Sequence, residues 1–133
     1  MTLRTQACGP AHARTRLSAA EKFLEVAQTI EGEFDPAFAG VAASLAILAG
    51  IAASDAACCQ MLGRRSRGDS HYDAVQLLSE ISGAQPAAEA LRRLIGLKDE
   101  AQYGLRFISQ ENQKKALRQA ALVLELARIL VRN

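Results

Sequence analysis

The most regular hydrophobic pattern in the chain runs from residue 36 to residue 62. Apolar side chains recur there at alternating spacings of four and three residues, which is the periodicity of one helix face. Asp35 and Pro36 supply an N-cap and a first-turn proline, and Gly63 supplies a stop. The pattern therefore predicts one helix of about 40 Å. Its repeating positions are Val41, Leu45, Leu48, Ala52, Asp55, Cys59 and Leu62.

Helical periodicity also marks segments on both sides of this long helix. Ser18 and Glu21 have the spacing of a capping box at the start of the first of them, and Ser109 opens the last. The predicted ranges are 17–30, 70–82, 86–97 and 109 to nearly 133. Because short connections favour antiparallel neighbours, we expect an all-α protein, an up-and-down four-helix bundle with an extra short helix.

The two ends of this pattern define the expected domain organisation. Residues 1–16 show no periodicity and contain the pair Gly9–Pro10, so we expect them to form a flexible basic tail. The bundle then occupies residues 17–133. No internal repeat and no second domain is predicted.

Composition supports a helical protein and narrows its partners. Half of the 133 residues are hydrophobic, yet only four phenylalanines, two tyrosines and no tryptophan occur. Residues that favour strands are sparse and show no alternating pattern. The net charge of +2 is nearly balanced, so the chain cannot coat nucleic acid by charge alone. Any anionic partner therefore requires a local basic patch.

Three features predict a cytoplasmic protein that has no contact with a membrane. The N-terminus lacks the apolar run of a signal peptide. Residues 37–53 approach the length of a membrane span but are mostly alanine and glycine, and Asp55 follows closely. Cys58 and Cys59 point about 100° apart on a helix, which suits neither a mutual bridge nor a zinc site. Together with Cys8 they are expected to be structural thiols in a reducing cytosol, and we expect no metal and no cofactor.

The segment GRRSRGDSHYDAVQLL, residues 63–78, gathers the residues best suited to chemistry. Arg64, Arg65 and Arg67 lie in the connection after the long helix, and His71 falls in the first turn of the next one. Backbone N–H groups at a helix start attract phosphate. A neutral imidazole beside a guanidinium suits acid–base chemistry on a phosphodiester. The alternative is that the arginines only offset the negative end of the preceding helix.

This junction resembles the motif of the HEPN family, in which an arginine and a histidine are separated by four to six residues between the second and third helices of a small bundle. Five residues separate Arg65 from His71 and six separate Arg64 from it, whereas only three separate Arg67. The resemblance covers about residues 17–132. It includes the alanine-rich helix, the junction, the LKDEAQYG connection and the long final helix.

The resemblance implies both a quaternary structure and an activity. HEPN proteins are typically homodimers whose arginine–histidine pairs line one cleft, and many are metal-independent endoribonucleases and toxins of toxin–antitoxin pairs. Here it implies RNA as substrate, His71 as the acid–base residue, and Arg65 or Arg64 as the phosphate partner. The RNA 2′-hydroxyl attacks and leaves a cyclic phosphate, and an antitoxin protein is a further partner. The alternative is a non-catalytic RNA-binding or protein-interaction module.

Six further side chains are expected to assist this site. Asp55 lies on the apolar face of the long helix, where a lone carboxylate is costly and needs a partner. That partner is either a side chain of a second subunit or an arginine that folds back. The other five could contact substrate or serve only structure, as loop-forming, capping or packing residues; they are Arg67, Ser66, Asp69, Lys98 and Tyr103.

One position departs from a subgroup of the family. HEPN toxins that are silenced by a nucleotidyltransferase antitoxin usually carry a tyrosine two residues after the histidine. Asp73 occupies that position, and Tyr72 comes one residue too early. Because one residue turns a helix by about 100°, Tyr72 is expected to face elsewhere. Separately, the phenylalanines at 34, 38 and 107 are expected in the core or at an interface.

Overall fold

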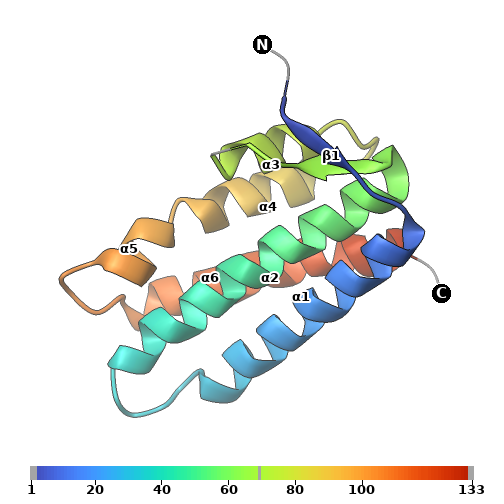
Figure 1. The fold of residues 1–133 in the computed structure, drawn as a ribbon. Coiled ribbons are helices and arrows are strands. Elements are labelled where there is room, and N and C mark those ends of the chain that lie inside the picture. The colour runs from blue at the N-terminus through green and yellow to red at the C-terminus, as the bar shows by residue number, and fades with distance from the viewer. Residues whose placement is uncertain (1–2, 69, 132–133) are drawn as a thin grey trace.

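The computed structural model describes residues 3–68 and 70–131, which form a helical bundle with one short β-ribbon (Figure 1). The prediction of a mainly helical protein is confirmed, and the ribbon is an addition that the sequence pattern did not reveal. The elements are β1 (Thr5–Ala7), α1 (Pro10–Ile30), α2 (Ala37–Leu62), β2 (Arg64–Ser66), α3 (Tyr72–Leu78), α4 (Gln85–Ile95), α5 (Lys98–Tyr103) and α6 (Gln110–Leu130).

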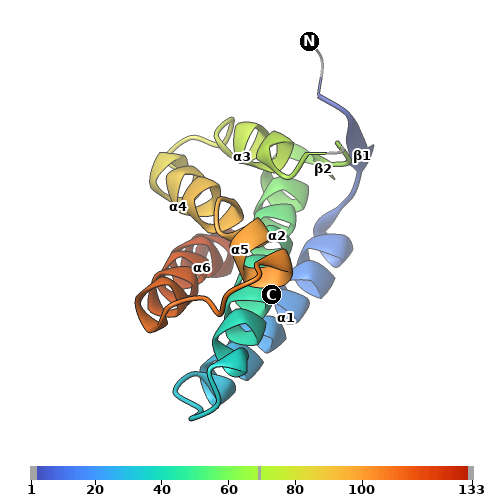
Figure 2. The ribbon, with the colours of Figure 1, turned by 90° about the vertical axis from the view of Figure 1, so that its left-hand side faces the viewer.

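Helix α2 is the central element, and it contacts every other helix of the bundle (Figures 1 and 2). Its buried surface is made mostly of alanine, and these small side chains let neighbouring helices approach closely. Gly50 shows how tight this approach is, since a Cβ there would collide with the Leu94 side chain of α4. The alanine-rich sequence of α2 therefore reflects its position between other helices.

The length and apolar composition of α2 would also suit a membrane span. In this fold, 56% of its most apolar 18-residue window is buried inside the protein. A core helix of a globular protein has the same length and composition. The packing of α2 is that of a core helix.

Helix α1 begins at Pro10, seven residues before the predicted range of 17–30, so the expectation of a flexible tail over residues 1–16 is wrong for the described part of that segment. Gly9 is the N-cap and Pro10 is the first helical residue. The imidazole Nδ1 of His12 accepts a hydrogen bond from the backbone N–H of Gly9 at 2.9 Å. Ala13 is fully buried, which anchors this first turn against the core. Glycine before proline is thus a helix start here and not a break.

Cys8 and Cys59 form a disulfide, which corrects the expectation of three structural thiols. The bridge closes a separation of 51 residues and ties the end of β1 to α2. The geometric argument excluded only a bridge between neighbouring cysteines, and treating the first residues as a tail removed Cys8 from consideration. Cys58 is the one free cysteine in the described part of the chain, and it is buried.

Thiol titration provides a direct check of this assignment. Unreduced protein in denaturant should show one reactive thiol per chain, and reduced protein should show three. In the native state at pH 8, Cys58 should not react, because burial raises the pKa of its thiol to about 12 and the thiolate is the reactive form. Three reactive thiols before reduction would contradict the bridge.

Candidate functional site

The ribbon places the arginines of the junction. Gly63 ends α2 with a φ of +70°, a conformation that favours glycine, and the chain enters β2 at once. Strand β2 pairs antiparallel with β1, so that Gln6 lies opposite Arg65 and Ala7 opposite Arg64. Because successive strand residues point to opposite faces, Arg64 and Arg65 diverge. The two arginines that the motif spacing left as alternatives therefore lie in different surroundings.

Arg64 forms an ion pair on the outside of the molecule. Its Nη2 lies 2.7 Å from Oε1 of Glu80, and both side chains are more than a third exposed. Arg64 is also absent from the described residues that line the cavity containing His71.

Arg65 points to the other face, where its guanidinium is held by two partners. Nη1 donates to Oδ2 of Asp55 at 3.2 Å. Nε and Nη2 donate to Oε1 of Gln6 on the paired strand, at 3.2 and 3.1 Å. An arginine that folds back onto Asp55 was one of the two partners that the sequence allowed. The position of Arg65 is thus set from α2 and from β1 together.

Asp55 holds a second arginine that the sequence analysis missed. Nε and Nη2 of Arg16, in α1, both lie 3.1 Å from the same carboxylate oxygen. Asp55 is only 6% exposed; burial raises the pKa of its carboxyl, and the two guanidiniums oppose that rise. Arg16 escaped notice because it lay at the edge of the supposed tail. Recognising Gly9–Pro10 as a helix start would have placed it on α1.

A cavity of about 280 Å³ brings Arg65 and His71 together. His71 is the N-cap of α3 and is exposed, one position before the helix turn in which it was expected. The cavity also contains three other residues of the predicted site or its neighbourhood: Asp55, Ser66 and Arg67. Ile51, Ala74, Arg16, Gly68 and Ser70 complete its described lining. Asp69 lies outside the residues that the structure describes.

Gly68 lets the loop before α3 close over Asp73. A Cβ at Gly68 would collide with the Asp73 carboxylate, so a larger residue there would require the Asp73 side chain or the loop to shift. Tyr72 is about half exposed and is not among the described residues that line the cavity, in keeping with the expectation that it faces elsewhere.

Lys98 and Tyr103 are not brought to this cavity. Both belong to α5, where the Lys98 ammonium lies 5.6 Å from the centre of the Tyr103 ring. Helix α5 approaches α2 at Gly40, and the cavity begins at Ile51, about 16 Å further along the helix axis.

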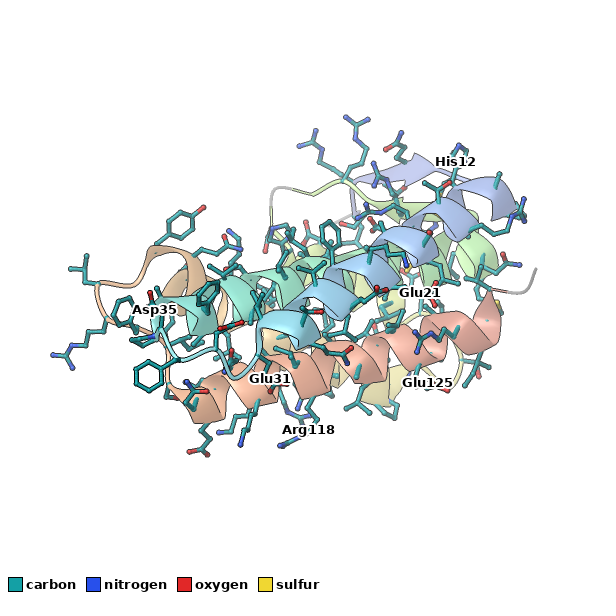
Figure 3. All side chains as sticks on the ribbon, turned by 90° about the horizontal axis from the view of Figure 1, so that it is seen from below. His12, Glu21, Glu31, Asp35, Arg118 and Glu125 are labelled. Atoms are coloured by element: carbon teal, nitrogen blue, oxygen red, sulfur yellow. A yellow bond between two sulfur atoms is a disulfide. The ribbon has the colours of Figure 1, made fainter. Side chains whose placement is uncertain are left out.

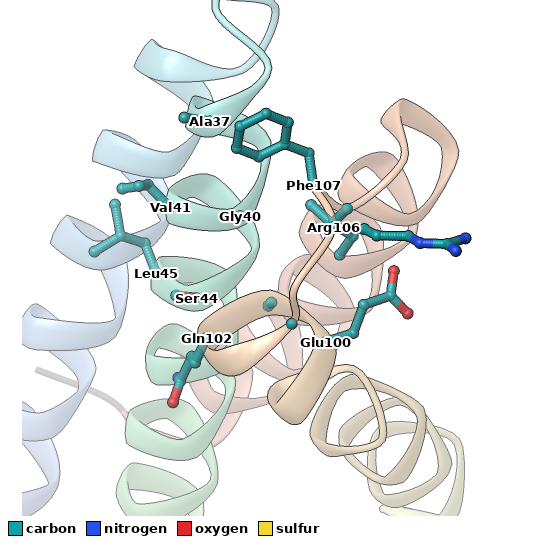
Figure 4. A pocket seen from close by; sticks show the side chains of 12 residues that line it. Ala37, Gly40, Val41, Ser44, Leu45, Glu100, Gln102, Arg106 and Phe107 are labelled. Atoms are coloured by element: carbon teal, nitrogen blue, oxygen red, sulfur yellow. The ribbon is translucent and has the colours of Figure 1, made fainter.

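A different cavity of about 430 Å³ lies where α5 approaches α2 (Figure 4). Its lining is mainly apolar, and Figure 4 shows Phe107 near the start of α2 while Arg106 extends away from that helix. The only ionisable side chains in its described lining are Glu100 and Arg106. This cavity offers less chemistry than the one containing Arg65 and His71.

The expected positions of three phenylalanines are corrected in part. Phe34, Phe38 and Phe107 are exposed by 101%, 38% and 66%, so none belongs to the core. Their place at an interface stays a prediction.

The arrangement around Arg65 has the parts of an anion site with an acid–base group. Two guanidiniums are fixed by one buried carboxylate, and an exposed imidazole lines the same cavity. Among residues 3–68 and 70–131, no group of three histidine, cysteine, aspartate or glutamate side chains is placed to hold a metal ion. No protein-family model and no curated protein matches the chain.

Proposed function

We propose that this protein is a HEPN-type endoribonuclease that cleaves RNA without a metal ion. The observation that carries the proposal is that Arg65 and His71 line one cavity, with five residues between them in the junction that joins α2 to α3. A bundle in which a long alanine-rich helix precedes this junction is also what the HEPN resemblance requires. Arg65, and not Arg64, is the functional arginine in this proposal.

The roles of the two residues follow from their surroundings. The His71 imidazole removes the proton of the RNA 2′-hydroxyl, whose oxygen attacks phosphorus. The bond from phosphorus to the 5′-oxygen breaks, and the leaving oxygen takes up the proton that His71 had removed. The products are a 2′,3′-cyclic phosphate and a 5′-hydroxyl. Arg65 stabilises the charge on the phosphoryl oxygens, and Asp55 and Gln6 keep its guanidinium in place.

The experiment that tests this proposal uses a labelled single-stranded RNA and the purified protein in excess EDTA. We expect cleavage to persist in the chelator and to yield ends with a cyclic phosphate and a 5′-hydroxyl. Cleavage that requires added magnesium, or ends with a 5′-phosphate, would contradict the mechanism.

We further propose that the protein is a homodimer joined through the exposed part of α2. Val41 and Leu48 are 50% and 41% exposed, and Leu45 and Ile51 of the same helix are half-buried. Ile51 also lines the cavity with His71, so this apolar strip continues into the candidate site. Pairing two copies along it would remove apolar surface from water and bring two cavities together.

Replacing Leu48 with aspartate should convert the dimer to a monomer, because a charge would be desolvated at the contact. Sedimentation velocity measures the change, and circular dichroism should show unchanged helix content. Leu122 of α6, 51% exposed, offers a matched control, since Leu122→Asp should stay dimeric. A monomeric wild-type protein would contradict the proposal.

In the cell, we propose that the protein acts in the cytoplasm as the toxin of a toxin–antitoxin pair. Expression in bacteria should arrest growth, and the arrest should depend on His71. A partner antitoxin would relieve it. In the cytoplasm, cellular thiols would act to reduce the Cys8–Cys59 bridge.

One observation favours a second candidate function, a non-catalytic RNA-binding module. Arg65 uses three of its N–H groups within the protein, and Arg64 is paired with Glu80. On this alternative the basic junction holds a phosphate without cleaving the strand. RNA would then bind with an affinity that falls as salt rises, and it would remain intact.

A further inference from the structure

A second cavity, of about 210 Å³, adjoins the one that contains His71. The two cavities share Arg16 and Arg65 in their walls. The second is enclosed by β1, the first turns of α1 and the Cys8–Cys59 bridge. Figure 3 shows His12 at this end of the molecule, close to β1 and among side chains tipped with nitrogen.

The side chains of this second cavity favour an anion. His12 accepts a hydrogen bond at Nδ1 from Gly9, so the neutral ring carries its proton on Nε2, which can donate to a ligand. Arg16 uses Nε and Nη2 to hold Asp55, which leaves the two hydrogens of Nη1. No acidic side chain is among the described residues that line the cavity.

Two further arginines flank the β-ribbon. Arg67 donates its backbone N–H to the carbonyl of Arg4 at 2.8 Å, and both side chains are exposed. This backbone contact places Arg4 and Arg67 side by side, although they are far apart in the sequence.

We infer that the second cavity binds the phosphate of the nucleotide adjacent to the scissile phosphate of an RNA strand. His12 Nε2 and Arg16 Nη1 donate to this neighbouring phosphate, while Arg65 lies between the two phosphate positions. The inference rests on the proposed function for the choice of RNA as the ligand. It deepens that function, because the minimal well-bound substrate then carries two phosphates.

The test measures binding without cleavage. We choose a dinucleotide and a trinucleotide of 2′-O-methyluridine, which carry one and two phosphodiesters and have no free internal 2′-hydroxyl to attack phosphorus. Wild-type protein should bind the trinucleotide about tenfold or more tightly than the dinucleotide, because the second phosphate gains charge-assisted hydrogen bonds. Binding is measured by calorimetry at two or more salt concentrations.

Thr15→Glu should remove the tighter binding of the trinucleotide, because Thr15 lines the second cavity and is exposed, and a negative charge there would repel phosphate. Thr29→Glu is the matched control. Thr29 is also exposed on α1, and both hydroxyls donate to the carbonyl four residues earlier, but Thr29 lies about 21 Å further along the helix. For the trinucleotide, log affinity falls as log salt concentration rises. The steepness of this fall should decrease by about 0.7 in Thr15→Glu and should not change in Thr29→Glu.

His12→Glu serves as a second variant that preserves the fold. Glutamate at this position can still accept the hydrogen bond of Gly9, as in a capping box, but its charge repels phosphate. His12→Glu should therefore lose the tighter binding of the trinucleotide, as Thr15→Glu does. Equal binding of the two oligonucleotides by wild type, or an unchanged gain in both cavity variants, would overturn the inference.

The outcomes separate this inference from the proposed ribonuclease activity. A gain that depends on Thr15 and His12, with unmodified RNA left intact, would support the second phosphate position and reject cleavage. Cleavage without any gain from the second phosphate would support the ribonuclease and reject the second position.

Discussion

Replacing His71 with alanine is expected to lower the rate of RNA cleavage by about 10²- to 10⁴-fold, the range that a positioned acid–base group supplies. The thermal midpoint should change little. His71 is exposed at the start of α3, and its imidazole makes no hydrogen bond among the described residues. A loss of activity in a stable protein would therefore reflect lost chemistry. Single-turnover cleavage of a labelled RNA in EDTA measures the rate.

Arg64→Ala is the control for this experiment. Arg64 lies in the same junction and satisfies the same family spacing as Arg65, but it pairs with Glu80 outside the cavity. Its removal should leave cleavage within a few-fold of wild type, whereas Arg65→Ala should approach the loss seen in His71→Ala. Equal rates for wild type and His71→Ala would reject the assigned role of His71. Loss of cleavage in Arg64→Ala, with cleavage retained in Arg65→Ala, would show that Arg64 and not Arg65 is the functional arginine.

Local sequence patterns predicted the helices that form the frame of this site. Helix α2 ends at Leu62 with Gly63 as its left-handed C-cap, where the pattern placed the stop. Helix α6 starts after Ser109, whose hydroxyl accepts the backbone N–H of Asn112 at 3.0 Å. These features are predictable because the cap residue and the groups it contacts are only a few positions apart.

The same reasoning failed at the N-terminus, where the determining contacts are distant in sequence. Strand β1 has only three residues, too few for an alternating pattern, and its partner β2 lies about sixty positions later. The bridge from Cys8 to Cys59 spans a similar interval. No local pattern encodes such a pairing, because the free energy comes from contacts that exist only after the chain has folded.

This failure also explains which site residues the sequence could and could not supply. Family spacing identified His71 and left Arg64 and Arg65 equivalent. Only strand pairing, which turns neighbouring side chains to opposite faces, separates the two arginines. Gln6 and Arg16, which hold Arg65 and Asp55, belong to the part that the pattern treated as a tail.

Removing the Cys8–Cys59 bridge is expected to have the largest effect on stability. A cross-link that closes a loop of 51 residues restricts the unfolded chain, and the loop-entropy relation gives about 4 kcal/mol. Cys8→Ser should lower the free energy of unfolding by up to that amount, measured by urea denaturation. Dithiothreitol should produce a similar loss in wild type and none in the variant.

Cys58→Ala is the matched control, because Cys58 neighbours the bridge in sequence but does not take part in it. Because this variant loses only a small buried thiol, its free energy of unfolding should fall by about 1 kcal/mol, and its unfolding should remain sensitive to dithiothreitol. Unfolding of wild type that is identical with and without the reductant would show that the bridge is not formed.

Loss of the bridge should also lower the activity of the candidate site. Cys8 follows β1 directly, and β1 carries Gln6, which holds two N–H groups of Arg65. Reduction would free one end of β1 and weaken that hold, while Asp55 would still bind Arg65 from α2. Cleavage by reduced protein should therefore fall but not vanish, and Gln6→Ala should lower cleavage in the oxidised protein in the same way. If reduction left cleavage unchanged while Gln6→Ala lowered it, strand pairing alone would be enough to keep β1, and with it Gln6, in place without the bridge.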